Sequence, residues 1–447
     1  MGRVVSLRLK ARSKLLNFVA SEGLLNARRA KTELQRKVTG QRHVVSTFLE
    51  LDDPYSYLLS HYLSELVEHF DIELRVYLTE AVTGPLRPAP ELYTEYALAD
   101  CTRVARELGI PFLDVNDTPP VEQRLALLDA LAARADGESF ANELFEAMAA
   151  YWRGDAEAVA RRAQEASGSG AAALLQENQQ KLESLGHYNT AMLHYGGEWY
   201  WGIDRLHYLV ARLHSVGASK KDTPPGIASI SQVMQVNLPV RPPAAAKDLP
   251  PLELFYSFRS PYSWLSLRRL LDIADAFGLE FVIRPVMPMA MRGMQVPRRK
   301  LLYIVADSSR EARRCGVPYG RIADPIGPGV ERCMAVLEYA LSEKRERDFL
   351  LSAGEAIWGK GIDVATDDGL RKVTGKAGLF WPDAKAALDD EEWRMKAEAN
   401  RADMMHAGSW GVPTIRVGDF VTWGQDRDWL IVRRIEEMCD SGEGILI

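Results

Sequence analysis

Ser260 and Pro261 form the dipeptide of this sequence that most clearly suggests chemistry. A run of strand-forming residues ends just before Ser260, and a helical pattern begins at Pro261. Proline is tolerated in the first turn of a helix because its missing N–H would have no partner within the helix. We therefore expect Ser260 to cap the helix, beside free backbone N–H groups and the positive end of the helix dipole. This position stabilises an anion, and a serine hydroxyl there can donate a hydrogen bond to a thiolate. Helix capping alone is the alternative interpretation.

A second informative segment is residues 410–414 (WGVPT), in which Pro413 enters an expected strand. A proline in this position is a candidate for a cis peptide bond. A cis turn would leave the backbone of Val412 as an open edge, to which an extended peptide can add like a strand. The alternative is an ordinary trans proline at the start of a strand.

The segment around Ser260 has a counterpart earlier in the chain. Residues 48–58 (FLELDDPYSYL) reappear as residues 255–265 (FYSFRSPYSWL), at a separation of 261 − 54 = 207 residues. Further matches pair 109–112 with 316–319 at the same separation, and 201–205 with 423–427 at 423 − 201 = 222 residues. A self-match of this length predicts the tandem duplication of a domain of roughly 200 residues.

Each copy shows the same expected order of elements: strand, helix, strand, helical insertion, hairpin and helix. In the first copy these elements cover residues 44–51, 54–70, 72–78, 91–185, 192–201 and 203–214. In the second copy they cover residues 252–258, 261–277, 280–285, 297–407, 414–423 and 426–438. Breaks in the first insertion are expected at Pro119-Pro120 and at residues 167–170 (SGSG). This plan predicts an α/β fold of two tandem thioredoxin-like domains, each with a helical insertion.

The chain is expected to divide into four regions. These are a basic helical N-terminal extension at 1–42, a degenerate first copy at 43–214, a proline-rich linker at 215–250 and the second copy at 251–447. In the extension, basic residues far outnumber the acidic Glu22 and Glu33. We interpret it as one or two helices that pack on the body and keep a solvated basic face. Contact with a membrane surface or an acidic partner is the alternative.

Composition excludes several classes of protein. With 447 residues, 47% hydrophobic and 26% charged, the chain has the make-up of an ordinary globular protein. Its net charge of −6 gives no basic field for nucleic acid, and no run approaches the roughly 18 apolar residues of a membrane span. The N-terminus lacks the apolar core of a signal peptide. Four cysteines without C-x-x-C argue for a reducing, cytoplasmic location, and no histidine has the spacing of a zinc site, so we expect no metal.

The second copy resembles the DsbA-like thioredoxin-fold family, in the branch of the 2-hydroxychromene-2-carboxylate isomerases and kappa-class glutathione transferases. The matching segments are residues 254–256 (LFY), 260–265 (SPYSWL), 284–285 (RP), 297–303 (PRRKLLY), 356–362 (AIWGKGI), 410–414 (WGVPT) and 423–427 (WGQDR). Residues 260–263 occupy the place where redox members of this fold carry C-x-x-C. Because both cysteine positions are serine, we do not expect a dithiol–disulfide oxidoreductase.

The resemblance implies that glutathione is the cofactor. Ser260 would then hydrogen-bond the glutathione sulfur as the catalytic residue and favour its thiolate form. The backbone at Val412 and Pro413 would pair with the cysteinyl part of the tripeptide. Gln425 and Asp426 would hold its γ-glutamyl end. Lys300 matches a basic residue that lies near the peptide.

Two activities follow from the resemblance, and both need a glutathione sulfur that is ionised near neutral pH. We favour an isomerase acting on a conjugated aromatic-degradation intermediate; a kappa-like transferase and a non-catalytic tandem binding or scaffold protein are the alternatives. The expected partner is a small hydrophobic or aromatic electrophile. One departure bears on its pocket: family members often carry an asparagine after the second strand, whereas residues 287–294 form a methionine-rich run without one.

The first copy acts as an internal control, because Asp53 stands at the Ser260 position and Ala191 (413 − 222) at the Pro413 position. A carboxylate about 4 Å from a thiolate costs roughly 4 kcal/mol at an effective dielectric near 20, which raises the thiol pKa by about 3 units. The helix dipole offsets only about 0.3–1 kcal/mol of this cost. A cis bond before Ala191 would cost about 2.5–4 kcal/mol, so we expect it to be trans. The first copy should therefore not activate glutathione. It could imitate the second subunit of a homodimer, forming an intrachain pseudo-dimer, and the chain could form a further homodimer.

Overall fold

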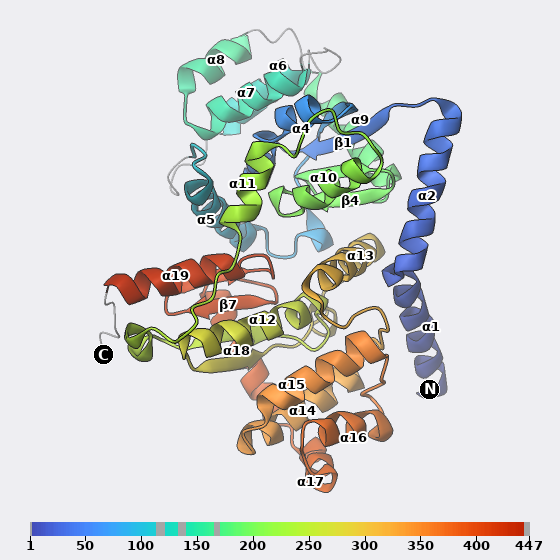
Figure 1. Ribbon diagram of the computed structural model, residues 1–447, viewed down its shortest axis with the longest axis vertical. Coiled ribbons are helices and arrows are strands. Elements are labelled where there is room, and N and C mark those ends of the chain that lie inside the picture. The colour runs from blue at the N-terminus through green and yellow to red at the C-terminus, as the bar shows by residue number, and fades with distance from the viewer. Residues whose placement is uncertain (1, 113–120, 133–139, 165–169, 442–447) are drawn as a thin grey trace. The chain divides into compact units, whose positions relative to one another are not determined.

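The computed structural model describes residues 2–112, 121–132, 140–164 and 170–441 (Figure 1). The chain divides into two compact units. The first unit is Asn26–Gln235, and the second unit combines Met1–Leu25 with Val236–Ile447. The four domain limits expected from the sequence remain predictions.

The first unit is built on a four-stranded sheet with the strand order β2-β1-β3-β4. The strands are β1 (His43–Leu49), β2 (Ile72–Leu78), β3 (Met192–Tyr195) and β4 (Glu198–Trp201). β1 runs parallel to β2 and antiparallel to β3, which forms a hairpin with β4. β1 is buried along almost its whole length, as its central place in the sheet requires. The helices along this part of the chain are α2 (Glu22–Thr39), α3 (Pro54–Ser60), α4 (Leu63–His69), α5 (Pro90–Leu108), α6 (Val121–Ala132), α7 (Phe140–Trp152), α8 (Ala156–Gln164), α9 (Ala171–Ser184), α10 (Leu206–Ser215) and α11 (Pro225–Val233).

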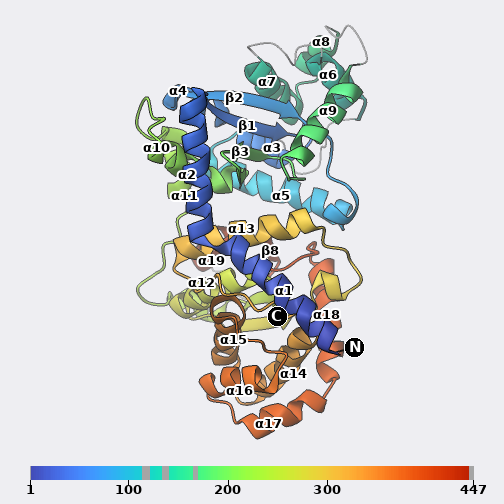
Figure 2. The same cartoon turned by 90° about the vertical axis from the view of Figure 1, so that its right-hand side faces the viewer.

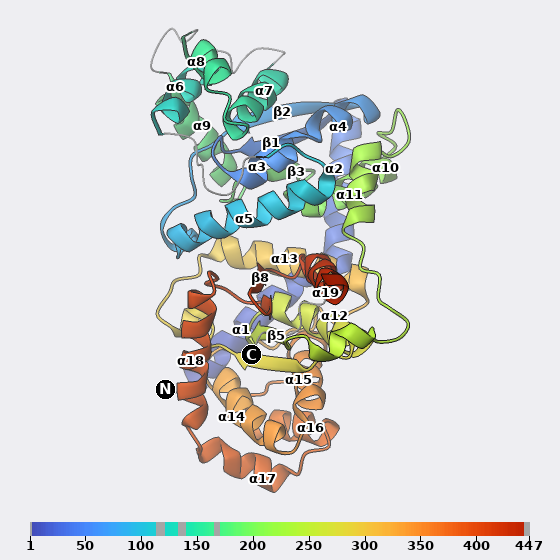
Figure 3. The ribbon, with the colours of Figure 1, turned by 90° about the vertical axis from the view of Figure 1, so that its left-hand side faces the viewer.

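The second unit repeats this topology with the strand order β6-β5-β7-β8. The strands are β5 (Leu252–Tyr256), β6 (Phe281–Pro285), β7 (Thr414–Val417) and β8 (Phe420–Trp423). β5 again pairs in parallel with one neighbour, β6, and antiparallel with the other, β7. Its helices are α1 (Gly2–Ala20), α12 (Pro261–Phe277), α13 (Arg298–Cys315), α14 (Pro328–Ser342), α15 (Glu346–Gly354), α16 (Asp367–Lys376), α17 (Trp381–Ala386), α18 (Glu392–His406) and α19 (Asp428–Ser441). Figure 3 shows α14, α15, α16 and α17 gathered into one helical group in this unit.

The predicted thioredoxin-like α/β fold with a helical insertion between the second strand and the hairpin is confirmed in both sheets. The helix expected at 261–277 is α12, residue for residue. The helix expected at 54–70 is instead divided into α3 and α4. The stretch expected as a linker contains α11, which begins at Pro225, because proline suits a first helical turn, and buries Ile227 and Ile230. Of the expected breaks in the first insertion, Pro119-Pro120 and residues 167–169 lie outside the described residues.

Three side-chain hydrogen bonds recur at matching positions of the two units. In the first pair, Tyr55 Oη donates to Asp100 Oδ2 (2.9 Å) and Tyr262 Oη donates to Asp307 Oδ2 (2.9 Å). In the second pair, Tyr57 Oη donates to the Pro111 carbonyl (2.9 Å) and Trp264 Nε1 to the Pro318 carbonyl (3.0 Å). In the third pair, Asn178 Nδ2 donates to the Leu78 carbonyl (2.8 Å) and Asn400 Nδ2 to the Pro285 carbonyl (3.1 Å). The tyrosine pair keeps the separation found in the sequence, since 262 − 55 and 307 − 100 are both 207. The two units therefore share internal contacts as well as strand order.

The N-terminal helix α1 is part of the second unit and packs against α13, which it crosses at an angle (Figure 2). Leu16 and Ala20 are buried in the core of this unit. The Ser13 Oγ accepts a hydrogen bond from the Asp324 N–H at 3.1 Å, and the Ser309 Oγ donates to the Ala20 carbonyl at 2.8 Å. Buried apolar contacts and these hydrogen bonds fit the first interpretation of the basic N-terminal region, a helix that packs on the body.

Candidate active site

Ser260 caps α12, as its sequence position predicts. The turn after β5 is closed by the Ser260 N–H, which donates to the Ser257 carbonyl at 2.9 Å. Ser260 has an extended backbone (φ −96°, ψ 113°), and its Oγ accepts a hydrogen bond from the Ser263 N–H at 3.1 Å. Pro261 occupies the first helical position. Ser260 is half-buried.

The loop before β7 lies directly beside Ser260, although 152 residues separate them in the sequence. The Ser260 Oγ donates to the Val412 carbonyl at 3.3 Å. The bond between Val412 and Pro413 is cis, the first of the two alternatives for this segment. Within the described residues, the Val412 N–H has no hydrogen-bond acceptor. The Gly424 N–H donates to the Pro413 carbonyl at 2.9 Å and so ties this loop to the end of β8. The fold thus brings Ser260, Val412 and Pro413 together.

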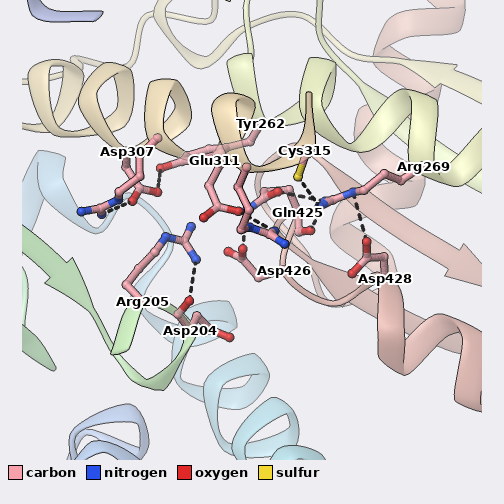
Figure 4. Close-up of polar contacts among 12 residues, drawn as sticks. Asp204, Arg205, Tyr262, Arg269, Asp307, Glu311, Cys315, Gln425, Asp426 and Asp428 are labelled. Atoms are coloured by element: carbon pink, nitrogen blue, oxygen red, sulfur yellow. Dashed lines mark hydrogen bonds and ion pairs between the residues drawn. The ribbon is translucent and has the colours of Figure 1, made fainter. Parts of the chain in front are cut away.

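Gln425 and Asp426 follow directly after Gly424, and their side chains belong to a polar network with α12 and α13 (Figure 4). Gln425 is buried. Its Oε1 accepts from Arg269 Nη2 at 2.9 Å, and its Nε2 donates to Glu311 Oε2 at 3.0 Å and to the Asp426 carboxylate. Because the amide is used in this way, Gln425 fixes the position of Asp426, which is half-buried. The resemblance assigns both side chains to the γ-glutamyl end of the tripeptide; the structure shows that the Gln425 amide bonds within the protein, and the assignment stays a prediction.

Lys300 lies in the first turn of α13. Asp307, seven residues later and on the same face of the helix, accepts the hydrogen bond from Tyr262 of α12. Seven residues span about 10 Å of helix, so Lys300 stands two turns away from this contact. Sequence reasoning missed Tyr262 and Asp307. The 207-residue separation, which matches them with Tyr55 and Asp100, is a signal that could have found them.

The residue before Ser260 forms an ion-pair cluster that the sequence did not reveal. Arg259 Nε lies 2.9 Å from Asp324 Oδ1, and Arg12 Nε of α1 lies 2.9 Å from Asp324 Oδ2. Burial lowers the pKa of the Arg12 guanidinium, and the Asp324 charge opposes this effect. Two guanidinium groups on one carboxylate leave a net positive charge next to Ser260. That charge, together with the α12 dipole, favours an anion at the serine.

The corresponding turn of the first unit has carboxyl groups instead. Glu50, Asp52 and Asp53 stand where the second copy has Ser257, Arg259 and Ser260. Asp53 caps α3: its Oδ2 accepts from the Ser56 N–H at 2.9 Å and from the Ser56 Oγ at 2.7 Å.

Two of these carboxyl groups are buried side chains, and burial sets their protonation. Burial raises the pKa of Glu50 to about 8, and the nearby Asp53 charge raises it further. Burial also raises the pKa of Asp53. The bond between Thr190 and Ala191 is trans, as expected. The first unit therefore places carboxyl groups at the position where the second unit places a hydroxyl.

A comparison with family models identifies the second half of the chain. Residues 251–436 match the model described as a DSBA-like thioredoxin domain. This segment is a DSBA-like thioredoxin domain. The match covers α12, the insertion, the cis-proline loop and most of α19, so all the candidate site residues lie within it.

Curated relatives of this DSBA-like domain include two proteins named 2-hydroxychromene-2-carboxylate isomerase. The protein from Pseudomonas putida is 24% identical over 200 residues, which cover 42% of this chain and 95% of the relative. The protein from Sphingobium xenophagum is 27% identical over 187 residues, which cover 39% of this chain and 93% of the relative.

Solved structures similar to the chain include a 2-hydroxychromene-2-carboxylate isomerase, with 22% identity and a TM-score of 0.38 over 42% of this chain and 96% of that one. Another is the cytosolic disulfide reductase DsbM from Pseudomonas aeruginosa with GSH, with 17% identity and a TM-score of 0.33 over 42% of this chain and 98% of that one.

Two features are absent from the described residues. None of their helices is both long enough and apolar enough to cross a bilayer. They also contain no group of three or more His, Cys, Asp or Glu side chains placed to hold a metal ion.

Proposed function

We propose that the DSBA-like domain is a glutathione-dependent isomerase of the 2-hydroxychromene-2-carboxylate isomerase type, acting on a conjugated aromatic-degradation intermediate. One observation carries the proposal: the Ser260 Oγ, at the N-terminus of α12, lies 3.3 Å from the carbonyl of Val412. A hydroxyl that can bind a sulfur therefore stands beside a backbone edge that can bind a peptide. The names of the two curated relatives support the same activity.

The residues around Ser260 fit a small thiol peptide. The Val412 N–H has no acceptor among the described residues, and its carbonyl is held only by the Ser260 hydroxyl, so an extended peptide can pair with both groups. When a thiolate lies beside α12, the Ser260 hydroxyl can turn its proton from the Val412 carbonyl to the sulfur. The Ser263 N–H keeps holding the Ser260 Oγ during this change. Asp426, fixed by Gln425, suits an ammonium group, and Lys300 suits a carboxylate of the same peptide.

Glutathione supplies a thiolate nucleophile, which adds reversibly to a conjugated carbonyl compound and so lets a former double bond rotate. The protein's part is to keep that sulfur ionised. The helix dipole, the Ser260 hydroxyl and the net positive charge of the Arg259, Asp324 and Arg12 cluster all act in this direction. A transferase needs the same ionised sulfur, and a product assay distinguishes the two reactions. We infer a cytoplasmic, reducing setting from the four free cysteines.

Calorimetric titration of the intact chain with glutathione tests the proposal. We expect one site per chain in the wild type, because the first unit carries Asp53 in place of the serine. Ser260→Ala should still bind, but the bound thiol should have a higher pKa, seen as a shifted thiolate absorbance titration. Loss of the cap should cost about 1 kcal/mol of unfolding free energy, which a helix as long as α12 tolerates.

Ser342→Ala, which changes an exposed serine at the end of α14, is the matched control. No heat of binding for wild type or Ser260→Ala would favour the non-catalytic binding or scaffold alternative. Two equivalent sites per chain would show that the first unit has kept the same function. Conversion of 2-hydroxychromene-2-carboxylate, compared with conjugation of a model electrophile, then separates isomerase from transferase.

A further inference from the structure

A cavity in the second unit lies between the loop after β6 and the helix α18. It has a volume of about 120 Å³ and is partly open to solvent. Its apolar wall is formed by Met287, Met291 and Trp393, and charged side chains of both segments line the rest. A dry cavity of about 150 Å³ can hold one benzene ring, so the size fits a single ring or a short branched chain.

The positive charges around this cavity are not equally neutralised. Arg401 Nε lies 2.9 Å from both carboxylate oxygens of Glu398, and Arg394 forms ion pairs on its own side of α18. Arg292, in the loop, is different. Within the described residues its guanidinium forms no ion pair or hydrogen bond, and its Nε is buried. Burial lowers the pKa of the Arg292 guanidinium and the nearby Arg401 charge lowers it further, whereas the Glu398 charge opposes both effects.

The cavity therefore combines a partly buried guanidinium that has no hydrogen-bond acceptor with an apolar wall, and it suits a ligand that has both a polar and an apolar part. Guanidinium pairs with carboxylate in a planar, two-bonded geometry, which makes a carboxylic acid a better partner than a neutral polar group. Methionine and tryptophan side chains pack well against an aromatic ring. We propose that this cavity binds a small carboxylic acid, whose ring or branched chain contacts Met287, Met291 and Trp393 while its carboxylate pairs with Arg292.

The cavity is close to the Val412 loop along α18. Met404 of this helix packs in the same small cluster as Val412, and Arg401 lies about one helical turn before it. The acid can therefore be either the second substrate of the thiol reaction or a separate effector. In the first case the inference rests on the proposed function. Binding to the cavity itself needs no glutathione, so the two ideas can fail separately.

Benzoate is the probe for the cavity, with benzamide as its neutral counterpart. We expect wild-type protein without glutathione to bind benzoate, and to bind benzamide at least fivefold more weakly, because only the carboxylate pairs with an arginine. Arg292→Gln should weaken benzoate binding by about tenfold or more, the usual size for loss of a charge-assisted pair. Arg345→Gln, which removes an exposed arginine outside the cavity, should bind as the wild type does.

Glu398→Gln should change the benzoate affinity in the opposite direction from Arg292→Gln. It removes the one carboxylate of the cavity lining and releases Arg401, so benzoate should bind about threefold more tightly. A general disturbance of the fold would weaken binding in both variants. The inference is overturned if wild type does not bind benzoate at concentrations up to roughly 10 mM, or if Arg292→Gln binds it within twofold of wild type. Equal affinity for benzamide overturns it too.

An inhibition experiment separates the two sources of the acid. Benzoate should compete with the second substrate of the thiol reaction if the cavity is the substrate site. It should change the rate without competing if the cavity holds an effector.

Discussion

The clearest test of the electrostatic reasoning is to give the second unit the carboxylate that the first unit already has. Ser260→Asp should keep α12 capped, because Asp53 caps α3 through the N–H and the hydroxyl of Ser56, and Ser263 stands at the Ser56 position. Ser260→Asn is the matched control, since asparagine is a good N-cap of the same shape without charge. Both variants should unfold within about 1 kcal/mol of the wild type.

The expected effect on bound glutathione follows from the position of Ser260. A carboxylate at this N-cap would lie about 4 Å from a bound sulfur and cost its thiolate roughly 4 kcal/mol at an effective dielectric near 20. At about 1.36 kcal/mol per pKa unit, the thiol pKa rises by about 3 units relative to Ser260→Asn. The Arg259, Asp324 and Arg12 cluster carries one net positive charge, which reduces this rise without cancelling it.

Ultraviolet absorbance of the thiolate, followed against pH with saturating glutathione, measures the pKa in wild type and both variants. Isomerase activity near neutral pH should be highest in the wild type, lower in Ser260→Asn and lowest in Ser260→Asp. If Ser260→Asp and Ser260→Asn give the same thiol pKa, the sulfur does not lie at the N-terminus of α12 and the reasoning is refuted.

Two further predictions concern the buried polar groups of the fold. The folded chain holds the Glu50 proton up to about pH 8, whereas the unfolded chain releases it near its ordinary value of 4.5. The stabilisation is therefore complete below pH 4.5 and is lost as pH rises to about 8, by at most about 5 kcal/mol over 8 − 4.5 = 3.5 units. Urea unfolding should show a steeper loss of stability with pH in the wild type than in Glu50→Gln, which keeps only the contribution of Asp53; equal slopes would contradict the assignment. Tyr262→Phe and Tyr55→Phe each leave the buried Asp307 or Asp100 with one donor fewer, so each should lower the unfolding free energy by about 1–3 kcal/mol. A change in one variant alone would show that the two matching contacts are not equivalent in energy.

Much of the fold follows from local sequence rules. The bounds of α12 and of the β7–β8 hairpin in the structure match those expected from the sequence. The match is close because proline, a capping serine and strand alternation act over a few residues. The repeated segment predicted that both copies share one order of elements along the chain, and the strand order of each sheet came from the structure. Sequence rules were weaker where a helix depends on its neighbours, as with α11, whose buried Ile227 and Ile230 stand among prolines typical of a linker.

The candidate site could be predicted only in part. Ser260 as an N-cap and the special nature of Pro413 follow from local chemistry. The burial of Gln425 could not be predicted, since it depends on Arg269 and Glu311 from two other helices. The same holds for Arg292: in the sequence it is one arginine among many, and its lack of a partner appears only when the loop and α18 are placed together.

By itself, then, the sequence determined the thioredoxin-like plan that both units share and the capping of α12 by Ser260, because both depend on neighbouring residues and on similar segments that can be read along the chain. Only the tertiary structure decided which distant groups meet. It placed the Val412 carbonyl against Ser260 across 152 residues and Arg12 of α1 on Asp324 beside Arg259. Such contacts depend on how helices and sheet pack into one core, and packing is a property of the whole unit rather than of any short segment.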